Sequence, residues 1–278
     1  MANYFFGAFQ INGSGYYVTS KELSMPVAKP VLFPIARRAG SKKSGERIDP
    51  KQIPVTIKII GSSRLDVTAK LDALQSALNL RGQSLIVHDT GTRAYQNVDC
   101  VSAATPIKAG NGVASCEVSC VFTAYDPLAY YNTLSTYDTG TLALTLSGGV
   151  YTFPSLVITG GGTTYAHPLI RLYNRTASGA TQWQSLTISQ TTDSQILTAT
   201  HSTATPLPAA NGDYVDIQCD PAVNGGWTIQ TNGNGLYIEP IGVFPVIEAG
   251  ATTFAISIAT SAAVSAECVF SWLARYCS

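Results

Sequence analysis

The chain has 278 residues, of which 45% are hydrophobic and 12% are charged, and its 17 Lys and Arg residues balance 17 Asp and Glu residues. This length suits two domains of about 100–200 residues each, and the 24 glycines favour short strands and turns over helices. A net charge of zero is unusual in a protein that must stay dispersed, so we expect an oligomer or particle component and exclude a strongly basic nucleic-acid-binding protein.

Neither end of the sequence suggests a secretory signal or a membrane span. Residues 1–6 contain neither the basic nor the apolar region of a signal peptide, so we expect synthesis in a cytoplasm. Residues 249–269 are weakly polar, but they include Glu267 and their apolar residues alternate as in a half-buried strand. We therefore expect no membrane insertion.

Charge divides the chain into two parts. Residues 1–130 hold 14 basic and 9 acidic residues, whereas residues 131–278 hold 3 and 8. The first part therefore carries a charge of +5 and the second a charge of −5. This change in composition predicts two domains, residues 1–130 and 131–278.

The first domain begins with two expected strands, residues 5–18 and 31–35, followed by a basic segment. Residues 37–47 break the apolar pattern, so we expect a long, basic, mobile loop there. Residues 37–51 contain six basic residues against two acidic ones.

The simplest interpretation of the basic segment is a solvated loop. A more specific interpretation is a contact surface, with either of two kinds of partner. Lys and Arg in a flexible arm can meet either an acidic neighbouring subunit or nucleic acid. No aromatic residue interleaves the run, which favours a protein contact over sequence-specific nucleic-acid binding. The candidate assembly contacts are Arg37, Arg38, Lys42, Lys43 and Arg47.

A strand at residues 55–60 leads directly into the expected helix, at about residues 64–81. Ser63 and Asp66 fit a capping box in its Asp variant, and Gly82 suits the position after the helix end. Apolar residues recur at steps of three and four, which predicts one buried face. That face consists of Val67, Leu71, Leu74 and Leu78, with Lys70, Asp72 and Gln75 in water.

Two hairpins are expected after the helix. Residues 84–88 and 94–98 flank a loop of hairpin length that contains Gly91. The second hairpin turns at residues 110–112 and returns as a strand over 113–122. The first domain is therefore predicted to be a small β-barrel or sandwich with one packed α-helix.

Short strand patterns separated by Gly- and Asn-rich turns fill the second domain. The spacing is that of an all-β sandwich, and no helical periodicity competes with it. The expected strands are residues 141–146, 155–159, 169–173, 186–189, 195–200, 214–219, 227–231, 236–239, 254–259 and 268–273.

The sequence carries no signature of an enzyme, a cofactor or a metal site. It has no nucleophile elbow, P-loop or zinc-protease motif, and its three histidines stand far apart. Paired carboxylates are scarce, and the pair Asp213 and Asp216 lies beside an expected turn, where solvated turn chemistry is the usual role. The cysteines form no CxxC pair, so we expect reduced core thiols.

Trp183 and Trp227 are candidate weak glycan contacts, because an aromatic face can stack on a sugar ring. Packing in the core or in a hairpin is the default interpretation of both. An indole exposed beside hydrogen-bonding side chains such as Asn224 or Asn232 would favour the sugar.

Several segments together resemble the distal tail proteins of long-tailed bacteriophages. Residues 55–61, 71–78 and 85–87, with Tyr95 and residues 125–127, are similar to the N-terminal domain of that family. Residues 242–250, the alternating apolar positions 254, 256 and 258, and residues 272–276 look like its closing strands.

The resemblance implies a structural, non-enzymatic virion protein at the tail tip. The N-terminal domains of the family form a homohexameric ring that joins the tail tube to the hub, and the C-terminal domain is a galectin-like sandwich of jelly-roll type. The implied partners are further copies of the chain, the tail tube protein, the hub and tape-measure proteins, and receptor-binding proteins. The segment 37–51 departs from the family, because it is more basic than a ring requires.

Two other functions remain open from the sequence. One is a carbohydrate-binding module that attaches a virion to its host and whose second domain binds the glycan. The other is a tail or capsid accessory protein of a different family with the same two-domain build.

Overall fold

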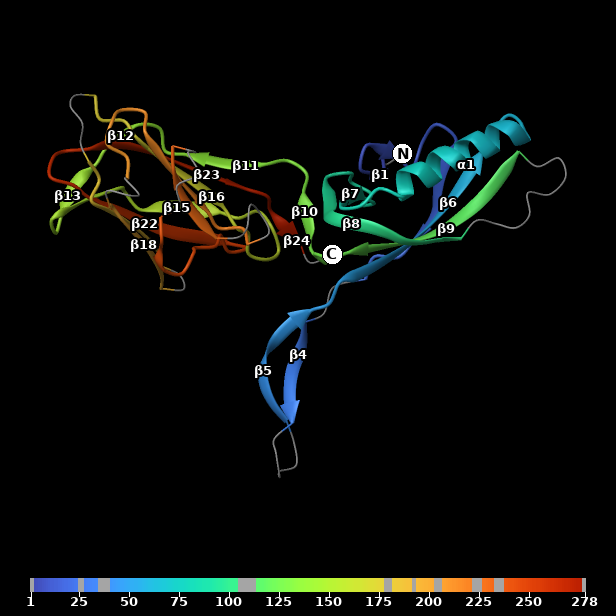
Figure 1. The fold of residues 1–278 in the computed structure, drawn as a ribbon, viewed down its shortest axis with the longest axis horizontal. Helices are drawn as coiled ribbons and strands as arrows, with labels where there is room; N and C mark the ends of the chain where they lie inside the picture. Colours follow the sequence, from blue (N-terminus) through green and yellow to red (C-terminus); the bar gives the residue numbers. More distant parts are fainter. Residues whose placement is uncertain are drawn as a thin grey trace. The chain divides into compact units, whose positions relative to one another are not determined.

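The computed structural model describes residues 3–24, 28–34, 41–104, 114–177, 182–191, 194–202, 207–221, 227–232 and 238–276. These residues form two compact units, one running to Asn132 and including Tyr276, the other spanning Thr133–Arg275. We call them unit 1 and unit 2. Both are mainly β, as predicted, and within the described residues the chain has one helix, α1 (Arg64–Leu78) in unit 1 (Figure 1).

Unit 1 is built on one large antiparallel sheet. Its strands run in the order β2-β1-β7-β8-β9-β6-β3, and β10 pairs with β8. The C-terminal strand β24 (Arg275–Tyr276) brings Tyr276 back to this unit, where the Arg93 guanidinium lies 3.7 Å from the centre of its ring. The other strands are β1 (Phe5–Phe6), β2 (Phe9–Gln10), β3 (Tyr16–Lys21), β6 (Lys51–Ile60), β7 (Gln83–Ile86), β8 (Arg93–Ala104), β9 (Ser115–Ala124) and β10 (Ala129–Tyr131).

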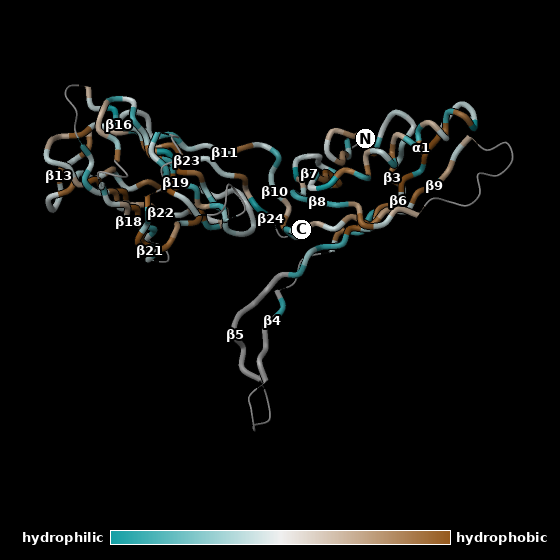
Figure 2. Tube along the Cα trace, viewed as in Figure 1, coloured by the Kyte–Doolittle hydropathy of each residue, from teal (hydrophilic) through white to brown (hydrophobic). Residues whose placement is uncertain are grey.

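The core of unit 1 follows from alternation along the central strands. In β6 every second residue from Lys51 to Ile59 is buried, and β9 places Val118, Cys120 and Phe122 on the same side of the sheet. Figure 2 shows hydrophobic residues concentrated along β6 and β9. Such alternation fixes the register, since a slip of one residue would turn the whole apolar row to water.

Helix α1 packs against this sheet through its predicted face. Val67, Leu74 and Leu78 are buried, and Leu71 is partly buried against the same core. The Ser63 side chain caps the helix by accepting from the Asp66 N–H at 3.2 Å, while Asp66 accepts from the backbone of Ser62 rather than of Ser63.

The helix ends earlier than Gly82 suggested. Its C-cap is Asn79, whose N–H bonds back to Gln75 and Ala77. Gly82, at φ +63°, serves the turn into β7 instead, where a left-handed backbone favours glycine.

A separate antiparallel sheet consists of β4 (Ala28–Pro34) and β5 (Ser41–Ile48) alone (Figure 1). We call it the ribbon. Among the described strands, β4 and β5 pair only with each other.

Unit 2 is a sandwich of two antiparallel sheets. The order in one is β11-β23-β16-β19-β20, with β12 added to β23; the order in the other is β13-β14-β22-β17-β18-β21, with β15 added to β22. The strands of the first sheet are β11 (Ser135–Asp138), β12 (Leu142–Ala143), β16 (Leu169–Asn174), β19 (Tyr214–Gln218), β20 (Thr228–Thr231) and β23 (Ser265–Trp272). Those of the second are β13 (Thr145–Ser147), β14 (Val150–Thr152), β15 (Leu156–Thr159), β17 (Ser185–Gln190), β18 (Gln195–Thr200), β21 (Ile241–Gly242) and β22 (Ala251–Ala259).

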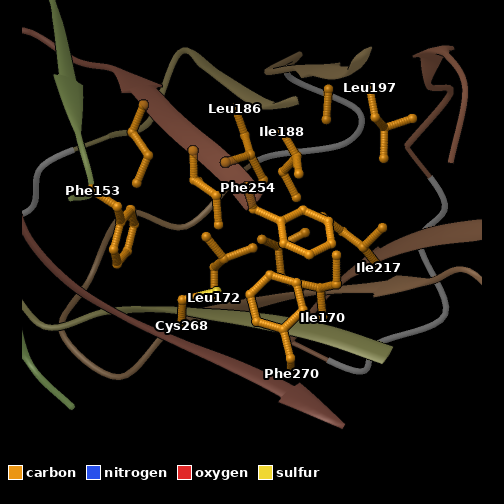
Figure 3. Packing of buried hydrophobic residues seen from close by; sticks show 14 of the residues in the cluster. Phe153, Ile170, Leu172, Leu186, Ile188, Leu197, Ile217, Phe254, Cys268 and Phe270 are labelled. Atoms are coloured by element: carbon orange, nitrogen blue, oxygen red, sulfur yellow. The ribbon is translucent and has the colours of Figure 1, made fainter. Parts of the chain in front are cut away.

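The two sheets of unit 2 enclose its core. Figure 3 shows side chains of both sheets pointing toward one another, among them Leu172 and Phe270 from one sheet and Ile188 and Phe254 from the other. The Phe254 and Phe270 ring centres lie 4.9 Å apart. The prediction of an all-β sandwich is confirmed.

In the described part of the chain, no helix is both long and apolar enough to span a membrane.

Candidate assembly surface

The ribbon carries three of the five predicted basic contacts. Lys42, Lys43 and Arg47 all belong to β5, and the register places them opposite Phe33, Leu32 and Lys29 of β4. The other two, Arg37 and Arg38, lie outside the described residues.

The prediction of a long mobile loop is wrong over residues 41–47. Residues 41–48 form β5, which pairs with β4 from Pro34↔Ser41 to Ala28↔Ile48. Antiparallel pairing uses backbone N–H and C=O groups, so it does not require apolar side chains. Strand β5 has no alternating apolar residues in its sequence, so it lacks the pattern by which strands are detected.

The two strands of the ribbon are joined by an ion pair at their base. Lys29, near the start of β4, lies 2.6 Å from Asp49, which follows β5. The Lys29 side chain is 63% exposed, so this contact is worth about 0–1 kcal/mol and serves mainly to align the strands.

A second lysine fixes the chain where it leaves the sheet toward the ribbon. At the end of β3, Lys21 Nζ donates to the Tyr4 hydroxyl at 2.9 Å, the Val87 carbonyl at 2.6 Å and Asp89 Oδ1 at 2.5 Å. Burial alone would lower the pKa of Lys21, but the hydrogen bonds to Asp89 and Tyr4 outweigh it and raise the pKa. The charged form is therefore the one that this position stabilises.

A third lysine fixes the chain where it returns from the ribbon. Lys51, the first residue of β6, is 5% exposed, and its Nζ donates to the Tyr95 hydroxyl at 2.6 Å. Tyr95 is fully buried, and its ring stacks on His88 at 6.1 Å between centres. Burial lowers the pKa of Lys51 to about 8, and it also lowers the pKa of His88.

The structural roles of Lys21 and Lys51, which we call the two anchors of the ribbon, were not predicted from the sequence. The strand pattern does, however, indicate that Lys51 is buried. Lys51 continues the odd-numbered row Ile53, Val55, Ile57 and Ile59, so the strand alternation itself places it on the buried face. Lys21 left no comparable signal, because its partners Tyr4, Val87 and Asp89 are distant in sequence.

The two candidate glycan contacts have opposite surroundings. Trp183 is fully buried in the core of unit 2 and so presents no face to a sugar. Trp227 is 59% exposed and stacks on Phe244, with ring centres 6.1 Å apart and planes 16° apart. The Asn232 amide is already engaged by Tyr214 and Asp213, and Asn224 lies outside the described residues.

The paired carboxylates of unit 2, Asp213 and Asp216, form hydrogen bonds within that unit. Asp213 accepts from the N–H groups of Ala209 and Ala210, as expected of turn chemistry. Asp216 lies within β19 and binds the Arg171 guanidinium through both oxygens, at 2.6 and 2.7 Å. In the part of the chain that the structure describes, no group of three or more His, Cys, Asp or Glu residues could hold a metal ion.

Comparisons with known proteins find a solved structure with a similar fold over nearly the whole chain. Neither a protein-family profile nor a curated protein sequence matches the chain. A crystal structure of the Dit protein (gp 19.1) of phage SPP1, described as a paradigm of the hub adsorption apparatus in phages that infect Gram-positive hosts, matches with a TM-score of 0.65 and 14% identity, over 98% of both chains. Two structures of the activated phage P2 baseplate, with Ca and with Sr, match with TM-scores of 0.46 and 0.44 at 9% identity, over 95% and 94% of this chain and 92% of theirs. The resemblance to distal tail proteins is thus confirmed at the level of the fold.

Proposed function

We propose that this chain is a non-enzymatic structural protein of a phage tail tip. In this proposal unit 1 forms a ring of six copies at the distal end of the tail tube, and the ring joins the tube to the hub and adhesion apparatus. The observation that carries the proposal is the match to SPP1 Dit, which extends over 98% of both chains and so includes both units. The partners are then the tail tube, hub and tape-measure proteins, with receptor-binding proteins as further ones.

Three physical features support an assembled state. The chain has no net charge, which suits a permanent particle component better than a dispersed monomer. Its two parts carry opposite charge, which favours ordered contacts between copies or with neighbours. The ribbon pairs with no other described strand, so its outer backbone groups remain available to a partner.

The state of assembly is tested with the purified full chain by native mass spectrometry and negative-stain imaging. We expect a ring of six subunits. A strictly monomeric species at high concentration would contradict the proposal.

The role of the basic residues is tested by changing Arg37, Arg38, Lys42, Lys43 and Arg47 together to Ser. We expect a weaker ring and poorer tail assembly while both units stay folded. A control variant with Lys58→Ser and Arg64→Ser removes positive charge elsewhere in unit 1. Normal assembly by the fivefold variant would remove these residues from the interface.

Glycan binding by unit 2 is a second candidate, and the exposed indole of Trp227 is the observation that favours it. Phe244 supports one face of the indole, as in sites where aromatic rings stack on sugars. We expect Trp227→Ala to abolish binding on a glycan array, whereas Ile241→Ala, at another exposed apolar residue of unit 2, should leave it unchanged. Absence of any binding by the unmodified chain would exclude this function.

A further inference from the structure

The second sheet of unit 2, which runs from β13 to β21, has an outer face without charged side chains. Strand alternation directs Leu186, Ile188 and Phe254 into the core (Figure 3), so the residues between them point outward. Within the described strands of this sheet, not one residue is Lys, Arg, Asp or Glu. We call the outward side chains of these strands the uncharged face. Its central row, fixed by the register, consists of Thr152, Ser257, Thr187, Thr198 and Ile241.

The outer face of the first sheet has a different composition. The register places Asp138, Arg171 and Asp216 in one row across it, and Glu267 lies in the next row. Protein surfaces that stay in water usually carry charged residues of both signs at about a quarter to a third of their positions. The first sheet meets this expectation and the uncharged face does not, so the uncharged face has the composition of a surface that another molecule covers.

Hydroxyl groups of the uncharged face already form hydrogen bonds within the sheet. The Ser189 hydroxyl donates to the Ala255 carbonyl at 3.3 Å, and the hydroxyls of Thr187 and Thr198 are bonded to each other at 3.3 Å. Burying a polar group is costly mainly when the group loses its hydrogen bond. These hydroxyls can therefore be covered by another surface without losing their partners.

Large apolar residues are exposed at both margins of the face. At the β21 margin Ile196, Ile241 and Val243 are 52%, 72% and 56% exposed. They lie together, because Ile241 pairs with Thr198 and the Val243 N–H donates to the Ile196 carbonyl at 2.9 Å. At the other margin, on β15, Val157 is 54% exposed. Neighbouring exposed apolar side chains of this kind are typical of interaction surfaces.

We propose that the uncharged faces of two copies of the chain pack against each other, so that two copies of unit 2 form a symmetric pair. Residues 131–278 carry a net charge of −5, so two copies of unit 2 repel each other where their charged surfaces meet. At the uncharged face they meet without like charges in contact, and a two-fold contact uses the same surface on both copies. A strongly charged partner would gain no charge pairing there.

The face is large enough for a contact of modest affinity. Five strand positions, from β14 and β15 to β21, about 4.8 Å apart and about six residues long, give a surface of about 24 by 20 Å. Two such surfaces bury about 1,000 Å² in projection, which is the lower limit for a specific protein interface. This contact lies entirely in unit 2, so it does not depend on the ring of the proposed function.

Sedimentation velocity of the full chain, at low and at high salt, tests the pairing. We expect the particle to contain an even number of copies and to keep its mass at high salt, because no charged groups meet at the contact. A ring held by the basic residues of the ribbon would instead weaken at high salt. Loss of the ring and loss of this contact are therefore distinguishable.

Variants locate the contact. Thr187→Lys places a charge at the centre of the face, and we expect it to halve the mass of the particle and to raise the dissociation constant of the pair about 100-fold or more. Ser257→Lys, on the next strand, should have the same effect. Thr136→Lys, on the outer face of the first sheet, adds the same charge to unit 2 and is the matched control.

The control also separates a local effect from a general one. A positive charge added anywhere to the acidic unit 2 reduces the overall repulsion between copies, so Thr136→Lys should keep the pair or strengthen it. Tryptophan fluorescence, which reports unit 2, checks that each variant is folded. The proposal is overturned if the folded Thr187→Lys and Ser257→Lys variants have the same mass as the original chain, or if Thr136→Lys halves the mass as well.

Discussion

Replacing Lys51 with Met tests the anchor at which the chain returns from the ribbon. Burial lowers the pKa of Lys51 from 10.5 to about 8. Below pH 8 the lysine is charged in both folded and unfolded chains, so the folded chain bears the full cost of burying the charge. Between pH 8 and 10.5 the unfolded chain binds the proton more strongly, so the free energy of unfolding rises with pH.

The size of this effect follows from the change in pKa. A fall from 10.5 to about 8 corresponds to about 3 kcal/mol at full effect. Structural relaxation and water penetration reduce the cost of a buried charge, so we expect a measured rise of about 1–2 kcal/mol by pH 10. In Lys51→Met the rise should be absent, because the titrating group is gone. At pH 7 the free energy of unfolding of the variant should differ from that of the original chain by less than about 2 kcal/mol, since removing a buried charge offsets the lost hydrogen bond to Tyr95.

The two units can be followed separately in one urea titration. Helical circular dichroism reports unit 1, which contains α1, whereas Trp183, Trp227 and Trp272 all belong to unit 2 and report it by fluorescence. Lys58→Met, on the same strand as Lys51 but not buried, is the control and should keep the pH dependence. An unchanged rise between pH 8 and 10 in Lys51→Met would refute the assignment.

Other substitutions should affect one unit at a time. Leu74→Ala should lower the free energy of unfolding of unit 1 by about 2–5 kcal/mol, seen in the helical signal and not in the fluorescence. Phe254→Ala should lower that of unit 2 by about 3–5 kcal/mol, with the opposite pattern of signals. Gly242→Ala should destabilise unit 2 by about 1–3 kcal/mol, because the residue has φ +116° and an added Cβ would lie 1.9 Å from the Ile196 carbonyl oxygen. Gly250→Ala, where the Cβ would meet nothing within 4 Å, should change it by less than about 0.5 kcal/mol; equal effects at the two glycines would contradict this reasoning.

The elements that sequence reasoning located correctly are those that bury one face. The strand expected at residues 55–60 and the helix starting at residue 64 both exist, because each must turn a row of apolar side chains toward the core. The strand is longer than expected and begins at Lys51, because a lysine interrupts the apolar row without interrupting the backbone pairing with Ala124. Alternation thus predicts where a strand is buried better than where it begins.

The features that escaped prediction depend on pairing between distant segments. Strand β5 has no alternating apolar residues in its sequence, and the partners of Lys21 come from two other parts of the chain, residue 4 and residues 87–89. The β-bulge between Cys100 and Ser102 shifts the register of β8 against β9 by one residue, and no local pattern encodes it. For the candidate assembly surface, the sequence therefore predicted which residues are basic but not the structure that carries them.

The two anchors account for only part of the stability that the ribbon needs. An isolated two-stranded hairpin is at best marginally stable in water, because it has no core of its own. Lys21 and Lys51 fix the positions at which the chain leaves and re-enters the sheet, and the Lys29–Asp49 pair aligns the strands between them. These contacts lie at the base of the ribbon, whereas farther along it the described strands β4 and β5 pair only with each other. A partner that pairs with or packs on the ribbon would support that pairing, and this is the physical reason to look for the assembly contact there first.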